Sequence, residues 1–79
     1  MPRFFFHIRD GDRLIEDPEG ADMPGLDAAR AAAVAAARTA IGELLRRGRA
    51  AAHRRSFAIA DGGGRVLATV TYRDVVRLH

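Results

Sequence analysis

Cysteine and lysine are both absent from this chain of 79 residues. Without cysteine, disulfides, thiolate nucleophiles and zinc–thiolate sites are excluded. Disulfides and structural zinc are what usually stabilises a small protein. An unaided core of this size contributes only about 3–5 kcal/mol of net stability. We therefore expect a single domain over residues 1–79 that gains stability from a partner chain.

Because lysine is absent, all 13 basic residues are arginine, and the formal net charge is +3 with a sequence pI near 11.0. Arginine binds phosphate and carboxylate through a planar fork that lysine lacks. A genome rich in G and C would produce the same excess of arginine and alanine, and we favour that explanation. The high pI is therefore weak evidence for a nucleic-acid partner.

Long apolar runs are also missing at the start of the chain. The opening segment MPRFFFHIRDGD turns charged after a few apolar residues, which is too short for the h-region of a signal peptide or for a membrane span. We expect a cytoplasmic protein with no membrane partner.

Two β-hairpins are predicted, and the first lies at the start of the chain. Residues 3–9, RFFFHIR, alternate between two sides with the period of a strand, and Asp10 and Gly11 follow as a strong signal for a type I′ turn. With these two residues as the loop, Ile8 faces Arg13, whereas a bulged three-residue loop would shift the pairing by one residue. The apolar face of this hairpin then carries Phe4, Phe6, Ile8 and Ile15.

The second hairpin is predicted from the segments SFAIA and RVLATVTY, which flank the glycine-rich stretch 61–64. Either Gly62 and Gly63 or the whole four-residue stretch forms its loop. The last seven residues, RDVVRLH, either extend the final strand or make one helical turn. The apolar face of this hairpin would carry Phe57, Ile59, Val66, Ala68, Val70 and Tyr72.

One long helix is predicted between the hairpins, after an acidic loop over residues 16–25. It begins at Leu26, consists almost entirely of strong helix formers, and ends near Gly48, which suits the left-handed position after a helix. About 22 residues give a length of about 33 Å. Its apolar face carries Leu26, Ala33, Val34, Ala37, Ile41, Leu44 and Leu45.

The predicted fold is therefore α+β, with a hairpin–helix–hairpin (ββαββ) order and a β-grasp-like four-stranded sheet packed on one long helix. We expect the strand order second–first–fourth–third, with the first and fourth strands parallel. The helix covers one face of the sheet and overhangs it by about 10 Å. The second face is left partly apolar, which is typical of a protein interface, and carries Phe5, His7, Leu14, Leu67, Thr69 and Thr71.

Several segments together resemble a family of short bacterial domains of unknown function. These are the opening MPRFFFH, the Asp-Gly turn followed by Leu-Ile and an acidic loop, the helix start LDAAR, and F-x-I-x-D with G-R-V-L near the end. The start, Met-Pro-Arg-aromatic-Phe-Phe-His, is the most specific part. The resemblance implies a bacterial setting and domain limits close to the ends of this chain, and no activity. Gly25 stands where Asp or Ser would be expected before the helix, which would weaken the N-cap.

Enzymatic chemistry finds little support in the residue pattern. His7, His53 and His79 lack the spacing of metal ligands, and Ser56 has no base in a recognisable arrangement. The glycine-rich turn 61–64 leads into a strand, whereas a phosphate-binding loop leads into a helix. We expect neither an enzyme nor a cofactor or metal. His7 would be a pH-sensitive group at a dimer interface only if the carboxylate of Glu16, expected across from Phe5, lay beside it.

The segment LLRRGRAAAHRR is the strongest basic feature. Its arginines could contact successive phosphates, but no aromatic residue is interleaved for base stacking, and the acidic loop 16–22 could offset the charge. The negative end of the helix dipole also explains Arg46 and Arg47. We favour a solvated or interface-forming charged end over a nucleic-acid surface. The possible anion or nucleic-acid contacts are Arg46, Arg47, Arg49, Arg54 and Arg55.

The sequence therefore favours a non-enzymatic protein-interaction module that acts as a homodimer through the second sheet face or an exposed edge strand. The alternative is a small nucleic-acid-binding or regulatory protein that uses the segment from Arg46 to Arg55. Salt dependence separates the two, because phosphate contacts weaken steeply with salt and an apolar sheet interface does not.

Overall fold

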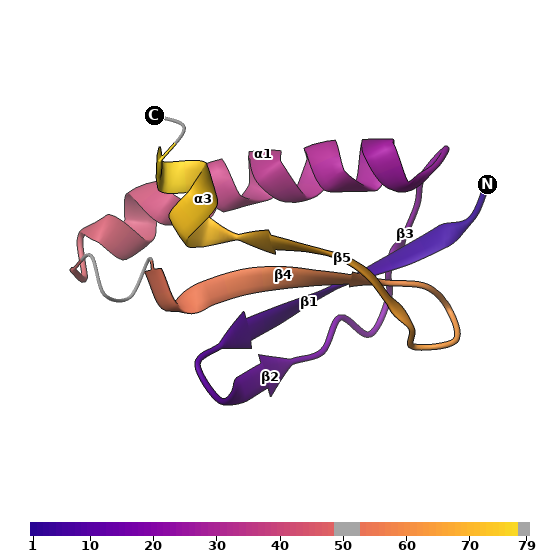
Figure 1. Ribbon diagram of the computed structural model, residues 1–79, viewed down its shortest axis with the longest axis horizontal. Helices are drawn as coiled ribbons and strands as arrows, with labels where there is room; N and C mark the ends of the chain where they lie inside the picture. Colours follow the sequence, from indigo (N-terminus) through magenta and orange to yellow (C-terminus); the bar gives the residue numbers. More distant parts are fainter. Residues whose placement is uncertain (49–52, 78–79) are drawn as a thin grey trace.

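The computed structural model describes residues 1–48 and 53–77 of the chain. The α+β class is confirmed, with the helix α1 lying along one side of an antiparallel sheet (Figure 1). Two short elements join the predicted ones, the strand β3 and the C-terminal helix α3. The elements in chain order are β1 (Arg3–Asp10), β2 (Arg13–Ile15), β3 (Ala21–Asp22), α1 (Leu26–Leu45), β4 (Arg55–Ala60), β5 (Val66–Thr71) and α3 (Tyr72–Arg77).

The strand order is β2-β1-β4-β5, and β3 pairs with the start of β1. All the strand pairs are antiparallel, so the predicted β-grasp-like order, with the last strand parallel to β1, was wrong. The helix α1 carries the chain from the Arg3 end of β1 to its Asp10 end. The strand β4 therefore starts opposite Asp10 and runs back along β1 to the pair of Phe5 with Ala60.

The first hairpin turns one residue later than predicted. Asp10 pairs with Arg13 and Ile8 with Ile15, so Gly11 and Asp12 form the loop. Gly11 has φ +62° and Asp12 has a negative φ, which is the pattern of a type II′ turn. Relative to the two-residue loop predicted from the sequence, each pairing moves by two residues. Every side chain therefore stays on its predicted face.

The second hairpin confirms most of its predicted core face. Phe57 pairs with Val70 and Ile59 with Ala68, and all four are buried. The register then shifts, so that Val66 pairs with Ala60 and its side chain is 54 % exposed, contrary to the prediction. The loop between Ala60 and Val66 covers residues 61–65, so it is one residue longer than the longer of the two predicted alternatives. Within it, the Asp61 carboxylate accepts hydrogen bonds from the backbone amides of Gly63 (2.9 Å) and Arg65 (3.0 Å).

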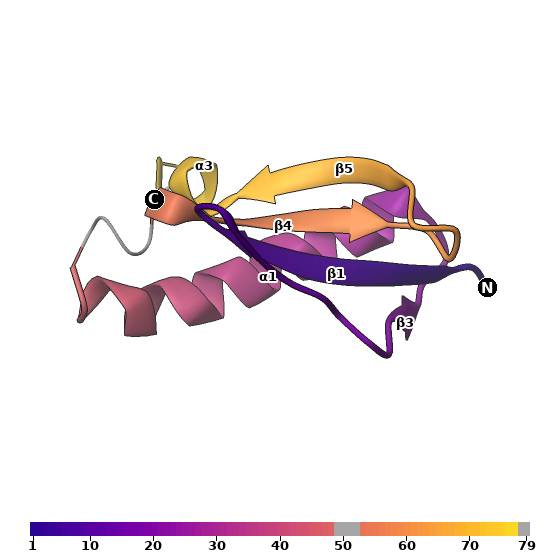
Figure 2. The same ribbon diagram turned by 90° about the horizontal axis from the view of Figure 1, so that it is seen from below.

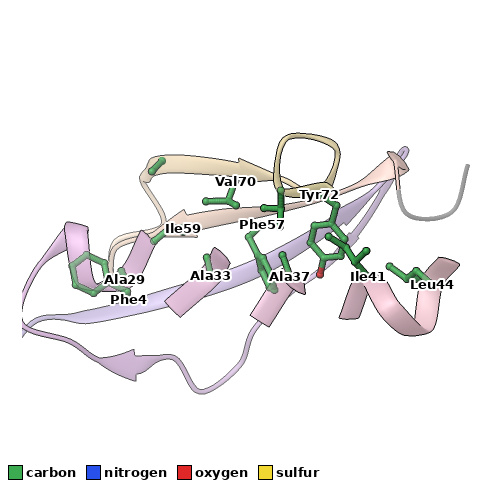
Figure 3. Close-up of a cluster of buried hydrophobic side chains, with 12 residues drawn as sticks. Phe4, Ala29, Ala33, Ala37, Ile41, Leu44, Phe57, Ile59, Val70 and Tyr72 are labelled. Carbon is green, nitrogen blue, oxygen red and sulfur yellow. The ribbon is translucent and has the colours of Figure 1, made fainter. Parts of the chain in front are cut away.

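The core lies between the sheet and a helix face made largely of alanine (Figure 3). Ala29, Ala33 and Ala37 are at most 1 % exposed, and their small side chains allow α1 to approach the sheet closely. Leu45, predicted on this face, is 44 % exposed. The helical alternative for the tail is the observed one, and the overhanging end of α1 is packed by α3 through the buried side chains of Tyr72 and Val75.

The connection between β2 and α1 depends on one glycine. Gly20 has φ +70°, and a β-carbon there would lie 2.9 Å from the carbonyl oxygen of Phe4. Farther along, the amide of Met23 donates to the carbonyl of Pro2 (3.0 Å), which holds the connection against β1. Gly25 is the N-cap of α1 and makes no side-chain capping bond, as its residue type implied.

We predict that Gly20→Ala lowers the free energy of unfolding by about 2 kcal/mol or more, because a β-carbon is both sterically and conformationally unfavourable there. Gly42→Ala is the matched control, since Gly42 lies inside α1 with open space around its missing β-carbon. That change should raise stability by about 0.5–1 kcal/mol. Urea unfolding measures both, and equal stability of Gly20→Ala and wild type would contradict the role of Gly20.

Candidate interaction surface

Both helices contact the same side of the sheet, so neither of them covers the opposite face. Figure 2 views the molecule from that side, with the strands in front of α1. Strand pairing places the predicted interface residues together here, because Leu14 pairs with Arg9, Thr69 with Ala58 and Thr71 with Ser56. Leu14 and Leu67 are 45 % and 39 % exposed. We call this surface, which carries Phe5, His7, Leu14, Leu67, Thr69 and Thr71, the open face.

The middle of the open face is uncharged when His7 is neutral. His7, Ala58 and Thr69 form a row across β1, β4 and β5. The ring of Phe5 stacks on that of His7, with centroids 6.3 Å apart. Contact with a second surface would therefore bury no fixed charge in this part of the face.

At one end of the open face, the segment after β2 folds back onto β1. The Asp17 carboxylate accepts hydrogen bonds from the amides of Phe6 (3.1 Å), Glu19 (3.1 Å) and Gly20 (3.2 Å). The Asp17 amide donates to Nδ1 of His7 (3.0 Å), so the neutral ring carries its proton on Nε2. This network joins the loop to the first strand.

A hollow of about 300 Å³ opens beside this network, lined by Phe5, His7, Glu16, Asp17, Asp61, Gly62 and Gly64. The sequence reasoning placed Glu16 across from Phe5. In the observed register, Glu16 instead follows Ile15, the partner of Ile8, and lines the hollow together with His7. The backbone amide of Asp17, rather than the Glu16 carboxylate, bonds the imidazole. We call this hollow and its three acids the acidic end of the open face.

At the other end of the same strands lies a hollow of about 260 Å³, lined by His53, Arg54, Arg55, Ser56, Thr71, Arg73 and Asp74. Nε of Arg54 and Nε of Arg55 lie 3.3 Å and 3.2 Å from the two carboxylate oxygens of Asp10. Asp10 thus fastens the start of β4 to the end of β1. We call this hollow, together with the neighbouring exposed Arg9, the basic end of the open face.

The structure divides the predicted arginine patch. Arg54 and Arg55 share one carboxylate, and Arg46 forms an exposed ion pair with Glu43 (3.4 Å). Arg47 is exposed, and Arg49 lies outside the described residues. Sequence reasoning missed Arg73, which α3 brings to the basic hollow. The helical alternative for the tail could have indicated this position, because it places Arg73 just after the last strand.

The pKa values of Asp10 and Asp17, the aspartates at the two ends of the open face, are lowered, which favours the ionised form. Burial raises the pKa of Asp17, but hydrogen bonds from three backbone amides outweigh it and hold this pKa below the ordinary value of 3.8. Desolvation likewise raises the pKa of Asp10, and the guanidinium groups of Arg55 and Arg54 bring it below 3.8. Each carboxylate therefore stabilises the fold in its ionised form.

Other kinds of site find no support in the part of the chain that the structure describes. Across residues 1–48 and 53–77, histidine and acidic side chains nowhere gather in a group of three that could hold a metal ion. Within the same residues, neither helix combines the length and the apolar character that crossing a bilayer requires.

A family model described as "Domain of unknown function (DUF6894)" matches residues 3–73. The chain belongs to this family. The match includes β1 through β5 and ends at the second residue of α3, so the DUF6894 domain contains the whole open face. Searches of curated proteins and of solved structures found no match. The function of this DUF6894 domain must therefore be argued from its own surface.

We predict that Asp17→Asn lowers the free energy of unfolding at neutral pH by about 1–3 kcal/mol, because three amides lose an ionised acceptor. A lowered folded-state pKa means that this stabilisation is complete above about pH 4 and is lost as pH falls through the folded value. The gap between wild type and variant should therefore shrink in acid. Urea unfolding from pH 7 to pH 3 measures this gap. A gap that stays constant in acid would contradict the role of the charge, and exposed Asp12→Asn is the control.

Proposed function

We propose that this DUF6894 domain is a non-enzymatic protein-interaction module that acts as a homodimer through its open face. The observation that supports this is the one-sided cover of the sheet, which leaves Leu14 and Leu67 exposed beside the neutral middle of the face. Exposed apolar residues grouped on one face are typical of an interface. A second copy would also supply stability that a core of this size lacks.

The chemistry of the two hollows favours binding over catalysis. In the acidic hollow, the carboxylates of Asp17 and Asp61 already accept hydrogen bonds from backbone amides. In the basic hollow, Ser56 has no hydrogen-bonded base among the described residues, so an activated nucleophile is missing there. Neither arrangement pairs a nucleophile or general acid with a partner that would tune it.

We predict that Leu67→Glu weakens the homodimer at least about tenfold, because a charge would be buried in the interface. Ala35→Glu is the matched control, since Ala35 is exposed on α1, away from the open face. Sedimentation velocity over a range of protein concentrations measures both. A wild type that stays monomeric at every concentration, or an equal effect of the two substitutions, would reject the proposal.

A second candidate function is the binding of nucleic-acid phosphates at the basic end. The observation that favours it is the hollow that brings Arg73 together with Arg54 and the hydroxyls of Ser56 and Thr71. Guanidinium and hydroxyl groups are the usual donors to phosphate oxygens. The ion pairs of Arg54 and Arg55 with Asp10 count against it, because they already offset part of the charge.

This second candidate predicts binding of single- or double-stranded oligonucleotides with a steep salt dependence. Replacing Arg46, Arg47 and Arg73 by alanine should then remove most of the binding and flatten the salt slope, while the Asp10 ion pairs stay intact. The control replaces the exposed Arg30, Arg38 and Arg65, which lie outside both this hollow and the predicted arginine patch. Fluorescence anisotropy at low and near-physiological salt is the measurement. Absence of binding by wild type at low salt would reject this candidate.

A further inference from the structure

The open face has opposite charges at its two ends. Arg9 is exposed on the face at one end, and Arg73 lines the basic hollow beside it. At the other end, Glu16 lines the acidic hollow with Asp17 and Asp61. Arg9 lies four positions along β1 from Phe5 at the acidic end, a distance of about 13 Å. The open face therefore carries positive charge at one end of its strands and negative charge at the other.

One charge at the acidic end and two at the basic end are unpaired among the described residues. The described residues contain ion pairs of Arg3 with Asp22, Arg46 with Glu43, and Arg54 and Arg55 with Asp10. Within the same residues, Arg9, Arg73 and Glu16 take part in no ion pair. All three are exposed. Their charges are thus available to a molecule that lies on the open face.

The middle of the face suits a second copy of the chain. The row of His7, Ala58 and Thr69 separates the two charged ends and can be covered without burying a fixed charge. The open face lies on the side of the molecule shown in Figure 2, which spans its longest and shortest extents, 37 × 16 Å. An interface there would lie at the small end of the range for specific complexes.

A two-fold axis that lies in the plane of the interface brings two copies face to face, and its two limiting directions, along and across the strands, differ in how the charges meet. If the axis runs along the strands, the strands of the copies are parallel and like charges meet at both ends. If the axis lies across the strands, the strands are antiparallel and each basic end meets an acidic end. Complementary charges favour the second arrangement, whereas like charges oppose the first.

We propose that the homodimer forms with the strands of its two open faces antiparallel, so that the Arg9 end of each copy lies on the Glu16 end of the other. This inference rests on the proposed function, which makes the open face the dimer interface, and adds its orientation. Charge complementarity between the ends then specifies both the partner and its direction. The uncharged middle supplies the apolar contact.

Charge reversal on the same chain tests this arrangement. Arg9→Glu places two acids opposite each other at both ends of the antiparallel dimer, and Glu16→Arg places two arginines there. Each single variant should therefore weaken the homodimer about tenfold at low salt. The double variant Arg9→Glu/Glu16→Arg restores opposite charges at both ends and should return the affinity to within about twofold of wild type. Arg30→Glu, an exposed reversal on α1, is the control.

Sedimentation velocity at low and high salt measures the affinities, and circular dichroism checks that each variant is folded. In a parallel dimer, Arg9 would lie opposite Arg9 and Glu16 opposite Glu16. Single reversals would then keep like charges together and leave the affinity near that of wild type, which would overturn the antiparallel orientation. Failure of the double variant to recover would overturn it as well. A wild type that does not dimerise would instead reject the proposed function itself, which distinguishes the two failures.

Discussion

Close packing between the alanine face of α1 and one side of the sheet is the contact on which the rest of the structure depends. Ala29, Ala33 and Ala37 bring the helix near to the sheet, and α3 closes the same layer at the end of α1 through Tyr72 and Val75. Because both helices occupy one side, neither covers the other, where the loop after β2 folds over the Phe5 end only. The candidate interface is a direct consequence of this two-layer arrangement.

Two aspartates hold the ends of the layers and give the open face its polarity. Asp10 joins the ends of β1 and β4 through Arg54 and Arg55, and Asp17 ties the loop after β2 to β1 through backbone amides. These carboxylates act inside the fold. Arg9 and Glu16 lie next to them in the sequence, are exposed, and form no ion pair with another described residue, so each end of the face keeps a net sign.

The side on which a strand residue lies was predictable, whereas strand order was not. Alternation along β1 placed Phe5 and His7 on the open face, and a pairing shift of two residues left that assignment intact. Val66 left the core because of a register shift between β4 and β5 that alternation does not reveal. The predicted strand order was wrong because a local sequence pattern does not indicate which strand of the second hairpin pairs with β1.

By itself, the sequence determined the two hairpins, the long helix and the residues that share a face, because these features follow from periodicity within short segments. Tertiary structure alone decided that β4 lies beside β1, that the tail folds into α3, and that Asp10 meets Arg54, 44 residues farther along the chain. It also brought Glu16 and His7 into one hollow and Arg73 and Arg54 into the other. These long-range contacts depend on how distant segments pack against one another, which no local sequence pattern specifies.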